Sequence, residues 1–218
     1  PPTPTHTHPS PPPALYTSPA PPWAPVGDTT NTATLGTMMA LVIAVPVAFC
    51  AARNPTPSVH FVRPVALFII VSSRSINSLI WALMLVTLIG PGVLAGVIAI
   101  GLRSIGFCAK LLYEAIEEID HNQVEAIIAT GSSRGQQLSF GIVPQIMPAF
   151  AGISVFRWDI NIRESTVLGL VGAGGIGLQL DASISTLAWT QVSLILIVIL
   201  ATVIVSDWVS AKIRHAII

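Results

Sequence analysis

Apolar residues in this chain gather into five long runs, which shorter polar stretches separate. Each run carries few charged residues. An α-helix rises 1.5 Å per residue, so runs of this length approach or reach the roughly 30 Å hydrocarbon thickness of a bilayer when they are helical. The pattern therefore predicts an all-α membrane protein with about five transmembrane helices, at about 35–52, 64–88, 92–111, 138–156 and 192–209.

The segment 1–34 differs from the rest of the chain in composition. It holds 11 of the 18 prolines, together with Thr, Ser and Ala and almost no charge. Proline lacks a backbone donor and fixes φ, so we expect residues 1–34 to be a disordered or polyproline-like tail. The stretch also lacks the basic segment and apolar core of a secretory signal peptide. The transmembrane domain is expected over residues 35–218.

Composition supports the membrane class. Hydrophobic residues make up 52% of the chain and charged residues only 9%, against about 25% charged in a typical soluble domain. The mean hydropathy is +0.76. Lys plus Arg and Asp plus Glu balance at 10 each, which argues against a nucleic-acid partner. Cys50 and Cys108 lie in apolar stretches, where packing is the expected role, and no cluster of side chains predicts a metal or cofactor.

Lysines and arginines near the span ends predict the orientation of the chain. Short loops that carry these residues stay cytoplasmic. In a five-span arrangement most of them fall on one side, which places the amino terminus outside; they are Arg53, Arg63, Lys110, Arg134, Lys212 and Arg214.

The longest polar block, residues 113–137, must lie in water. It carries five acidic side chains and Arg134. Residues 114–129 have Ala, Ile and Val on one side and acids on the other, which predicts an amphipathic helix that Gly131 ends; Ser132 and Ser133 are suited to cap a following helix. Such a helix, projecting from a membrane domain, is able to dock in a groove of a partner protein.

The spacing in this block resembles the EAA signature of ABC importer permeases. Its matching residues are Glu125, Ala126, Gly131 and Pro144, while Ile127, Gly141 and Val143 depart mildly from the usual residues. The resemblance implies a type I ABC importer permease fold with a cytoplasmic coupling helix. It also implies that the docking partner is a cytoplasmic ATP-binding subunit, which hydrolyses ATP, so that this chain performs no catalysis of its own.

Residues 114–218 closely resemble the permease of phosphonate ABC transporters, particularly in the segments 141–148, 157–163 and 166–177. Residues 35–113 resemble the same family more loosely. The resemblance implies a multi-pass protein of the bacterial inner membrane, surrounded by lipid. It further implies a homodimer that receives phosphonate from an extracytoplasmic binding protein.

A charged patch follows the fourth apolar run. Arg157, Asp159, Arg163 and Glu164 are the residues we expect to line the substrate path, because guanidinium groups match the acceptor oxygens of a phosphonate. Asp159 and Arg163 are four residues apart and can pair on a helix, which would leave Arg157 freer. The alternative is a set of interfacial ion pairs that only orient the helix end. Arg103, in the third run, is a weaker candidate for the path because its side chain is able to snorkel.

A glycine-rich stretch, residues 169–177, satisfies the dinucleotide fingerprint GxGxxG. The fingerprint also needs a βαβ unit and an acid about 20 residues on, and residue 197 lies in the last span. We therefore interpret the glycines as permitting tight turns and close backbone approach. In the resembling family this segment is an external loop and re-entrant turn beside the substrate path, which adds Gly172, Gly174 and Gly175 to the candidates.

Other functions remain open at this point. A permease for another small solute, such as methionine or a quaternary amine, would share the same cytoplasmic loop. A degenerate subunit that inserts but does not transport is a second alternative. A membrane enzyme using Asp159 with Glu164 or His215 as acid and base is a third, although the sequence offers it no nucleophile.

Overall fold

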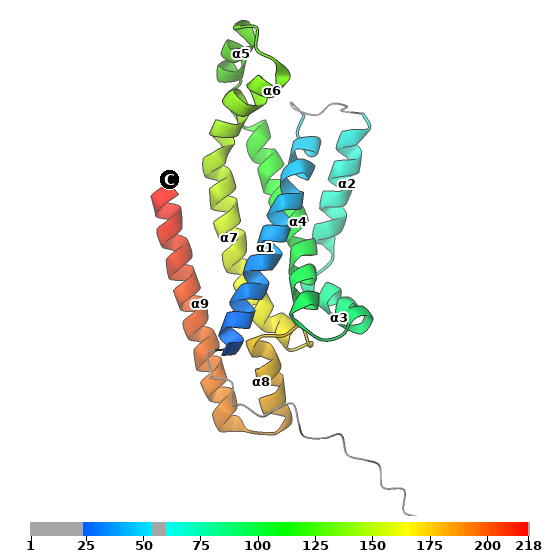
Figure 1. The fold of residues 1–218 in the computed structure, drawn as a ribbon, viewed down its shortest axis with the longest axis vertical. Helices are drawn as coiled ribbons and strands as arrows, with labels where there is room; N and C mark the ends of the chain where they lie inside the picture. The colour runs from blue at the N-terminus through cyan, green and yellow to red at the C-terminus, as the bar shows by residue number, and fades with distance from the viewer. Residues whose placement is uncertain (1–23, 54–59, 218) are drawn as a thin grey trace, which may run out of the picture.

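The computed structural model describes residues 24–53 and 60–217 and shows only helices in these ranges (Figure 1). A π-helical turn, η1, joins two of the helices into one continuous segment. The elements are α1 (Ala24–Ala51), α2 (Val62–Ser75), α3 (Ser78–Ile89), α4 (Val93–Glu117), α5 (His121–Ala129), α6 (Arg134–Gln136), η1 (Gln137–Ile142), α7 (Val143–Gly169), α8 (Ile176–Ser185) and α9 (Trp189–Ile217).

Four segments are long and apolar enough to cross a membrane by themselves: α1, α4, the continuous stretch Arg134–Gly169 and α9. The pair α2 and α3 passes the same test together, but the two helices meet at an angle of 85°. The described residues therefore contain four spans, or five if the bent pair counts as one. The predicted all-α membrane architecture is confirmed.

The first helix begins earlier than the sequence pattern predicts. It starts at Ala24, so the expectation that residues up to 34 are disordered is wrong for 24–34, while residues 1–23 lie outside the described residues. Pro25 stands in the first helical turn, where a missing backbone donor costs nothing. Thr29 and Thr32 donate hydroxyl hydrogen bonds to carbonyls four residues back, at 2.9 and 2.7 Å, so these polar side chains are satisfied inside the bundle.

The second apolar run, residues 64–88, does not form one straight helix. Ile76 adopts an extended conformation after α2, and the Asn77 side chain caps α3 by accepting a hydrogen bond from the Leu79 amide at 3.1 Å. The polar residues 72–75 and this cap are the local features that the hydropathy pattern overlooks. The bend turns α3 sharply away from the line of α2 (Figure 1).

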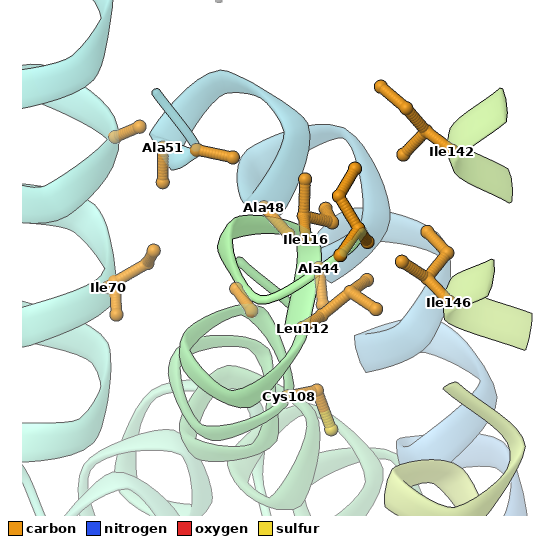
Figure 2. Packing of buried hydrophobic residues seen from close by; sticks show 13 residues of the cluster. Ala44, Ala48, Ala51, Ile70, Cys108, Leu112, Ile116, Ile142 and Ile146 are labelled. Carbon is orange, nitrogen blue, oxygen red and sulfur yellow. The ribbon is translucent and has the colours of Figure 1, made fainter. Parts of the chain in front are cut away.

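Helix α4 packs against α1, α2, α3 and α7, and small residues let it approach them closely. Ala44, Ala48 and Ala51 of α1 are fully buried against it, beside Leu112 and Ile116 of α4 (Figure 2). Membrane helices gain no hydrophobic effect from leaving lipid, so close packing of small residues is a main source of their association. This tight contact fixes the frame on which the polar side chains of the bundle are held.

Candidate functional site

The predicted charged patch lies within helix α7 and not beyond its end, since α7 runs on to Gly169. Its four charged residues point to two different sides of the helix. Arg157 and Glu164 join a polar network with α1, α3 and α4, whereas Asp159 and Arg163 contact α9. The structure thus divides the predicted patch into two clusters, which we call the interior network and the α7–α9 cluster.

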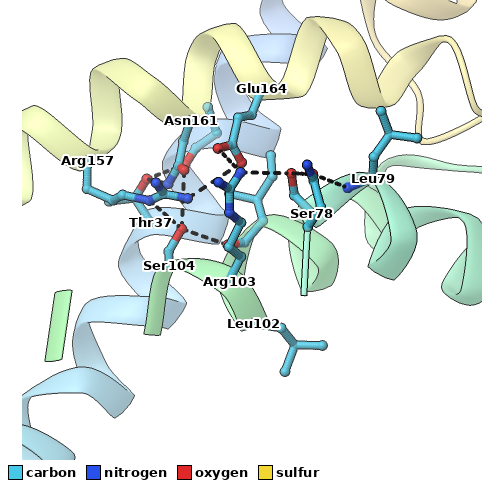
Figure 3. A network of polar contacts seen from close by, with 12 residues as sticks. Thr37, Ser78, Leu79, Leu102, Arg103, Ser104, Arg157, Asn161 and Glu164 are labelled. Atoms are coloured by element: carbon cyan, nitrogen blue, oxygen red, sulfur yellow. Dashed lines mark hydrogen bonds and ion pairs between the residues drawn. The ribbon is translucent and has the colours of Figure 1, made fainter. Parts of the chain in front are cut away.

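The interior network is organised around Glu164 (Figure 3). One of its carboxylate oxygens accepts from Nη1 of Arg103 at 2.5 Å, and the other accepts from Nη2 of Arg157 at 3.5 Å. Arg103 also donates to the Ser78 hydroxyl at 3.4 Å. A single carboxylate therefore serves two guanidinium groups.

Neutral side chains complete the interior network and tie α1 to α7. Asn161 donates to the Thr37 hydroxyl at 2.7 Å and accepts from Ser104 at 3.2 Å. The Ser104 hydroxyl in turn accepts from Nε of Arg157 at 2.9 Å. Asn161 and Ser104 are fully buried. Buried polar groups are costly unless paired, so these hydrogen bonds stabilise the arrangement of the helices that carry them.

Arg157 is held more tightly than the sequence predicts. Its side chain is 2% exposed, and its guanidinium lies 5.0 Å from the centre of the Phe107 ring. The expectation that Arg157 would be freer than its neighbours is wrong, because Ser104, Glu164 and Phe107 enclose it. Among the predicted site residues of this network, Glu164 is partly exposed at 16%, and the weaker candidate Arg103 is the most open at 32%.

The interior network lies near the middle of the membrane-spanning helices. Thr37 stands close to the midpoint of α1 (Ala24–Ala51), and Arg103 stands close to the midpoint of α4 (Val93–Glu117). At a rise of 1.5 Å per residue, each lies roughly 15–21 Å from either end of its helix. Charges at such depth are expensive and in general face a protein interior or an aqueous path.

The α7–α9 cluster confirms the predicted pair of Asp159 and Arg163. Their side chains are in contact, and Asp159 also accepts from the Ser206 hydroxyl at 2.9 Å. Arg163 additionally pairs with Asp207 at 2.5 Å, and both of these side chains are about half exposed, at 47% and 52%. Asp207 is not among the predicted site residues, although a lone acid inside an apolar run is itself a signal of a functional or interface position.

The glycine-rich turn packs tightly between helices. Gly172, Gly174 and Gly175 all have positive φ, as the interpretation of tight turns expects. A Cβ on Gly175 would lie 2.5 Å from the Thr29 hydroxyl, and that hydroxyl accepts from the Ile176 amide at 2.9 Å. Helix α7, and not a strand, precedes the turn, which removes the structural context of a dinucleotide site.

The amphipathic helix predicted over 114–129 is not one helix, because α4 ends at Glu117 and α5 begins at His121. Asp120 caps α5 by accepting from the Asn122 amide at 3.0 Å, and Gly131, at φ 80°, follows its last turn. The α5 residues Glu125 and Ala126 are exposed, and Pro144 stands shortly after the π-helical turn η1, at the start of α7. The helix thus presents a free surface on the end of the molecule where α5 and α6 project (Figure 1).

Two departures from the usual EAA residues lie against each other. A Cβ on Gly141 would be 3.3 Å from Cδ1 of Ile127 and 3.5 Å from Cγ2 of Val124. The large Ile127 therefore fills space that the small Gly141 leaves open. This contact packs α5 onto η1, which continues directly into α7.

Neither acid–base pair of the enzyme alternative is assembled by the structure. Asp159 belongs to the α7–α9 cluster and Glu164 to the interior network, and His215 is exposed near the end of α9. In the part of the chain that the structure describes, no three His, Cys, Asp or Glu side chains are close enough to hold a metal ion.

Residues 40–217 match the family described as the binding-protein-dependent transport system inner membrane component. The match covers most of the chain and includes α5 and all of α7. The chain belongs to this family. It is a transport permease subunit and a multi-pass component of the inner membrane.

Known proteins resemble this permease in sequence and in fold. The phosphite transport system permease protein PtxC of Stutzerimonas stutzeri is 42% identical over 190 residues, which are 87% of this chain and 69% of the relative. The phosphate-import permease protein PhnE of Mycolicibacterium smegmatis is 40% identical over 183 residues, 84% of this chain and 34% of that longer protein.

A solved structure of the MetNI methionine ABC transporter in inward-facing conformations superposes on this permease with a TM-score of 0.76. The two chains are 20% identical, and the superposition covers 89% of this chain and 95% of the other. At this identity the likeness shows the fold alone. It confirms the type I ABC importer permease fold.

Proposed function

We propose that this chain is the membrane-spanning permease of an ATP-driven importer that carries a phosphorus oxyanion, such as phosphonate or phosphite, into the cell. The observation that carries the proposal is the interior network, in which Arg103 and Arg157 share Glu164 at mid-membrane depth. The names of the relatives, a phosphite permease and a phosphate-import permease, support the same class of solute. An excess guanidinium disfavours a quaternary amine, which carries positive charge itself.

Coupling to ATP hydrolysis is assigned to α5. We infer that Glu125 and Ala126 dock on a cytoplasmic ATP-binding subunit, with Gly131 and Pro144 fixing the angle at which α5 leaves α7. The positive-inside rule supports a cytoplasmic location for this end, since most Lys and Arg residues near span ends lie there. A binding protein would then meet the opposite end, near α3, α8 and the start of α9 (Figure 1).

The short segment η1 lies between the proposed docking helix α5 and the charged side chains of α7. Helix α5 packs on η1, and η1 continues without a break into α7, which carries both charged clusters. Short π-helical segments are often found at functional sites in helices. A movement of α5 when the ATP-binding subunits close would be transmitted along α7 to Arg157 and Glu164 and change which side of the membrane they face.

A second copy of the chain is proposed to cover the α7–α9 cluster. Arg163 and Asp207 are half exposed within their helices, and half-exposed charges in lipid are unfavourable. In a homodimer these side chains would face the partner copy or a shared aqueous path. Asp159 and Arg163 then line the path from one side, and the turn with Gly172, Gly174 and Gly175 shapes its outer end.

Growth on a single phosphorus source tests the proposal. A strain without phosphonate, phosphite and phosphate importers would receive this chain with its ATP-binding subunit and binding protein. We expect rescue on at least one of the three anions, and loss of rescue with Glu125→Arg although the variant still inserts. The companion variant Gln123→Arg, on the same exposed helix, controls for added charge. Membrane insertion without rescue on any of the three would contradict the proposal.

A further inference from the structure

The bend between α2 and α3 lies beside the open end of the interior network. Ser73, in the last turn of α2, accepts from the Gly106 amide at 3.0 Å and donates to the Leu102 carbonyl, so the end of α2 is level with Arg103. The first residue of α3, Ser78, is 2% exposed and accepts from Arg103. The start of α3 therefore stands at mid-membrane depth, next to a cationic side chain (Figure 3).

Charge in the interior network does not balance. Arg103 and Arg157 contribute two positive charges and Glu164 one negative charge, and the neutral partners Ser78, Ser104 and Asn161 add none. A charge that is buried without a full counter-charge is strongly unfavourable, because the interior solvates it far less well than water does. An unbalanced guanidinium at this depth is thus a strong attraction for an anion.

The spare hydrogen-bonding capacity lies on the side of Arg103. Both of its hydrogen bonds to described residues use Nη1, so Nε and Nη2 keep donors for a ligand. Trp81 lies one turn after Ser78 on α3, and its indole nitrogen is buried without a partner among the described residues. The positive end of the α3 dipole adds to the same region. Arg157, by contrast, is enclosed.

We propose that Arg103, Ser78 and the start of α3 form an oxyanion-binding subsite in the path, and that Glu164 is the internal competitor that releases the anion. This inference rests on the proposed function, and it adds Ser78 and the start of α3 to Arg103, which the sequence offered only as a weaker candidate for the path. The arriving oxyanion binds first to Nε and Nη2 of Arg103 and then takes the place of the Glu164 carboxylate on Nη1, while Glu164 stays paired with Arg157. A phosphorus monoanion brings the net charge of the network from positive to neutral.

Release follows from the same exchange. When α7 moves with α5, Glu164 returns to Arg103 and displaces the oxyanion, because a carboxylate and a phosphorus oxyanion compete for the same planar donor fork. The oxyanion is therefore not held permanently on Arg103. The affinity of the subsite for the oxyanion depends on the difference between two interaction free energies, that of the oxyanion with Arg103 and that of Glu164 with Arg103. It does not depend on the full interaction energy of either pair alone.

Binding of inorganic phosphite to the purified permease tests the subsite without the binding protein. Phosphite would be titrated into detergent-solubilised protein and followed by phosphorus NMR line broadening, with methylphosphonate and phosphate as competitors. We expect Arg103→Gln to weaken binding at least tenfold and Glu164→Gln to tighten it several-fold, since the competing carboxylate is lost. Both variants should lower the maximal uptake rate, the first by failing to hold the anion and the second by failing to release it.

Matched variants separate an anion site from a merely structural ion pair. Lys110→Gln removes a cation from the same helix, α4, where its pair with Glu114 is exposed, and should leave phosphite binding unchanged. Arg103→Lys keeps the positive charge but loses the planar pair of guanidinium donors, and Ser78→Ala removes one hydroxyl. Each variant should give an intermediate loss of phosphite affinity. These two variants keep the test valid even if Arg103→Gln does not fold. Shifts of Arg103→Gln and Glu164→Gln in the same direction, or no shift in either, would overturn the subsite.

The subsite and the proposed function fail in different ways. If the wild-type chain rescues growth while Arg103→Gln, Arg103→Lys and Ser78→Ala bind phosphite as the wild type does, the subsite is wrong and the function stands. If the wild type rescues growth on none of the three anions, the function is wrong, and the titration still decides the subsite: phosphite binding that depends on Arg103 supports it, and absence of binding overturns it.

Discussion

At the residue scale, the position of each of the four charged residues on α7 decides which neighbouring helices its side chain contacts. Arg157 and Glu164 lie on the interior side, whereas Asp159 and Arg163 lie toward α9. The sequence predicted that Asp159 and Arg163 would pair. It did not predict that the four would separate, because the partners that divide them, Ser104 and Ser206, come from other helices.

A pair of glycines gives a prediction at this scale. A Cβ on Gly177 would lie 2.1 Å from the Thr166 carbonyl oxygen, whereas a Cβ on Gly152 would meet nothing within 4 Å. Gly177→Ala should therefore lower stability by about 2 kcal/mol, the cost of overpacking a rigid backbone contact. Gly152→Ala should be neutral or stabilise α7 by up to about 1 kcal/mol. Thermal denaturation in detergent measures both, and equal midpoints for the two variants would show that the turn is not tightly packed.

At the element scale, α5, η1 and α7 act as one unit. The sequence predicted the glycine stop at Gly131 and the helix that follows, but it placed one helix over 114–129, where the structure has a break at 118–120 before α5. The π-helical turn and the packing of Ile127 on Gly141 were not predicted, because both depend on the angle at which α5 folds back. The proposed transmission of movement from α5 to the charged clusters would depend on this packing.

Exchanging the two side chains tests the packing of α5 on η1. Ile127→Ala opens a cavity, and Gly141→Ile places a side chain where Ile127 already lies, so each change alone should weaken stimulation of the ATP-binding subunit. The double variant restores the volume and should recover most of the stimulation, with a coupling energy of about 0.5–3 kcal/mol. ATPase activity of the reconstituted transporter is the measurement. Additive losses would mean that the two side chains act independently.

At the scale of the whole molecule, the two ends differ in character. One end carries α5 and α6, and the other carries α3, α8 and the glycine-rich turn (Figure 1). Arg53 follows the end of α1, Arg63 stands at the start of α2 and Lys110 stands near the end of α4, so all three belong to the first end. The interior network lies between them, near the middle of α1 and α4. This arrangement suits the proposed transport of a solute that enters at one end, binds at mid-depth and leaves toward the end that carries α5.

Cysteine labelling in intact cells tests this orientation. Gln123 on α5 and Thr186 after α8 are both exposed, so a cysteine at either position should react with a maleimide that reaches it. In a background without Cys50 and Cys108, we expect an impermeant maleimide to label Thr186→Cys in whole cells and Gln123→Cys only after the membrane is opened. The reverse pattern would show that α5 faces outward and would contradict its coupling role.

The sequence by itself determined the membrane class, the approximate position of the long helices, and the polar helical segment that Gly131 ends. These features follow from hydrophobic length and from contacts within a few residues. The tertiary structure decided where the apolar run at 64–88 bends, that residues 24–34 extend the first helix, and which charges meet. Thr37 and Asn161 are 124 residues apart, and Arg103 and Glu164 are 61 apart, so only the packing of α1, α4 and α7 brings them together at mid-depth.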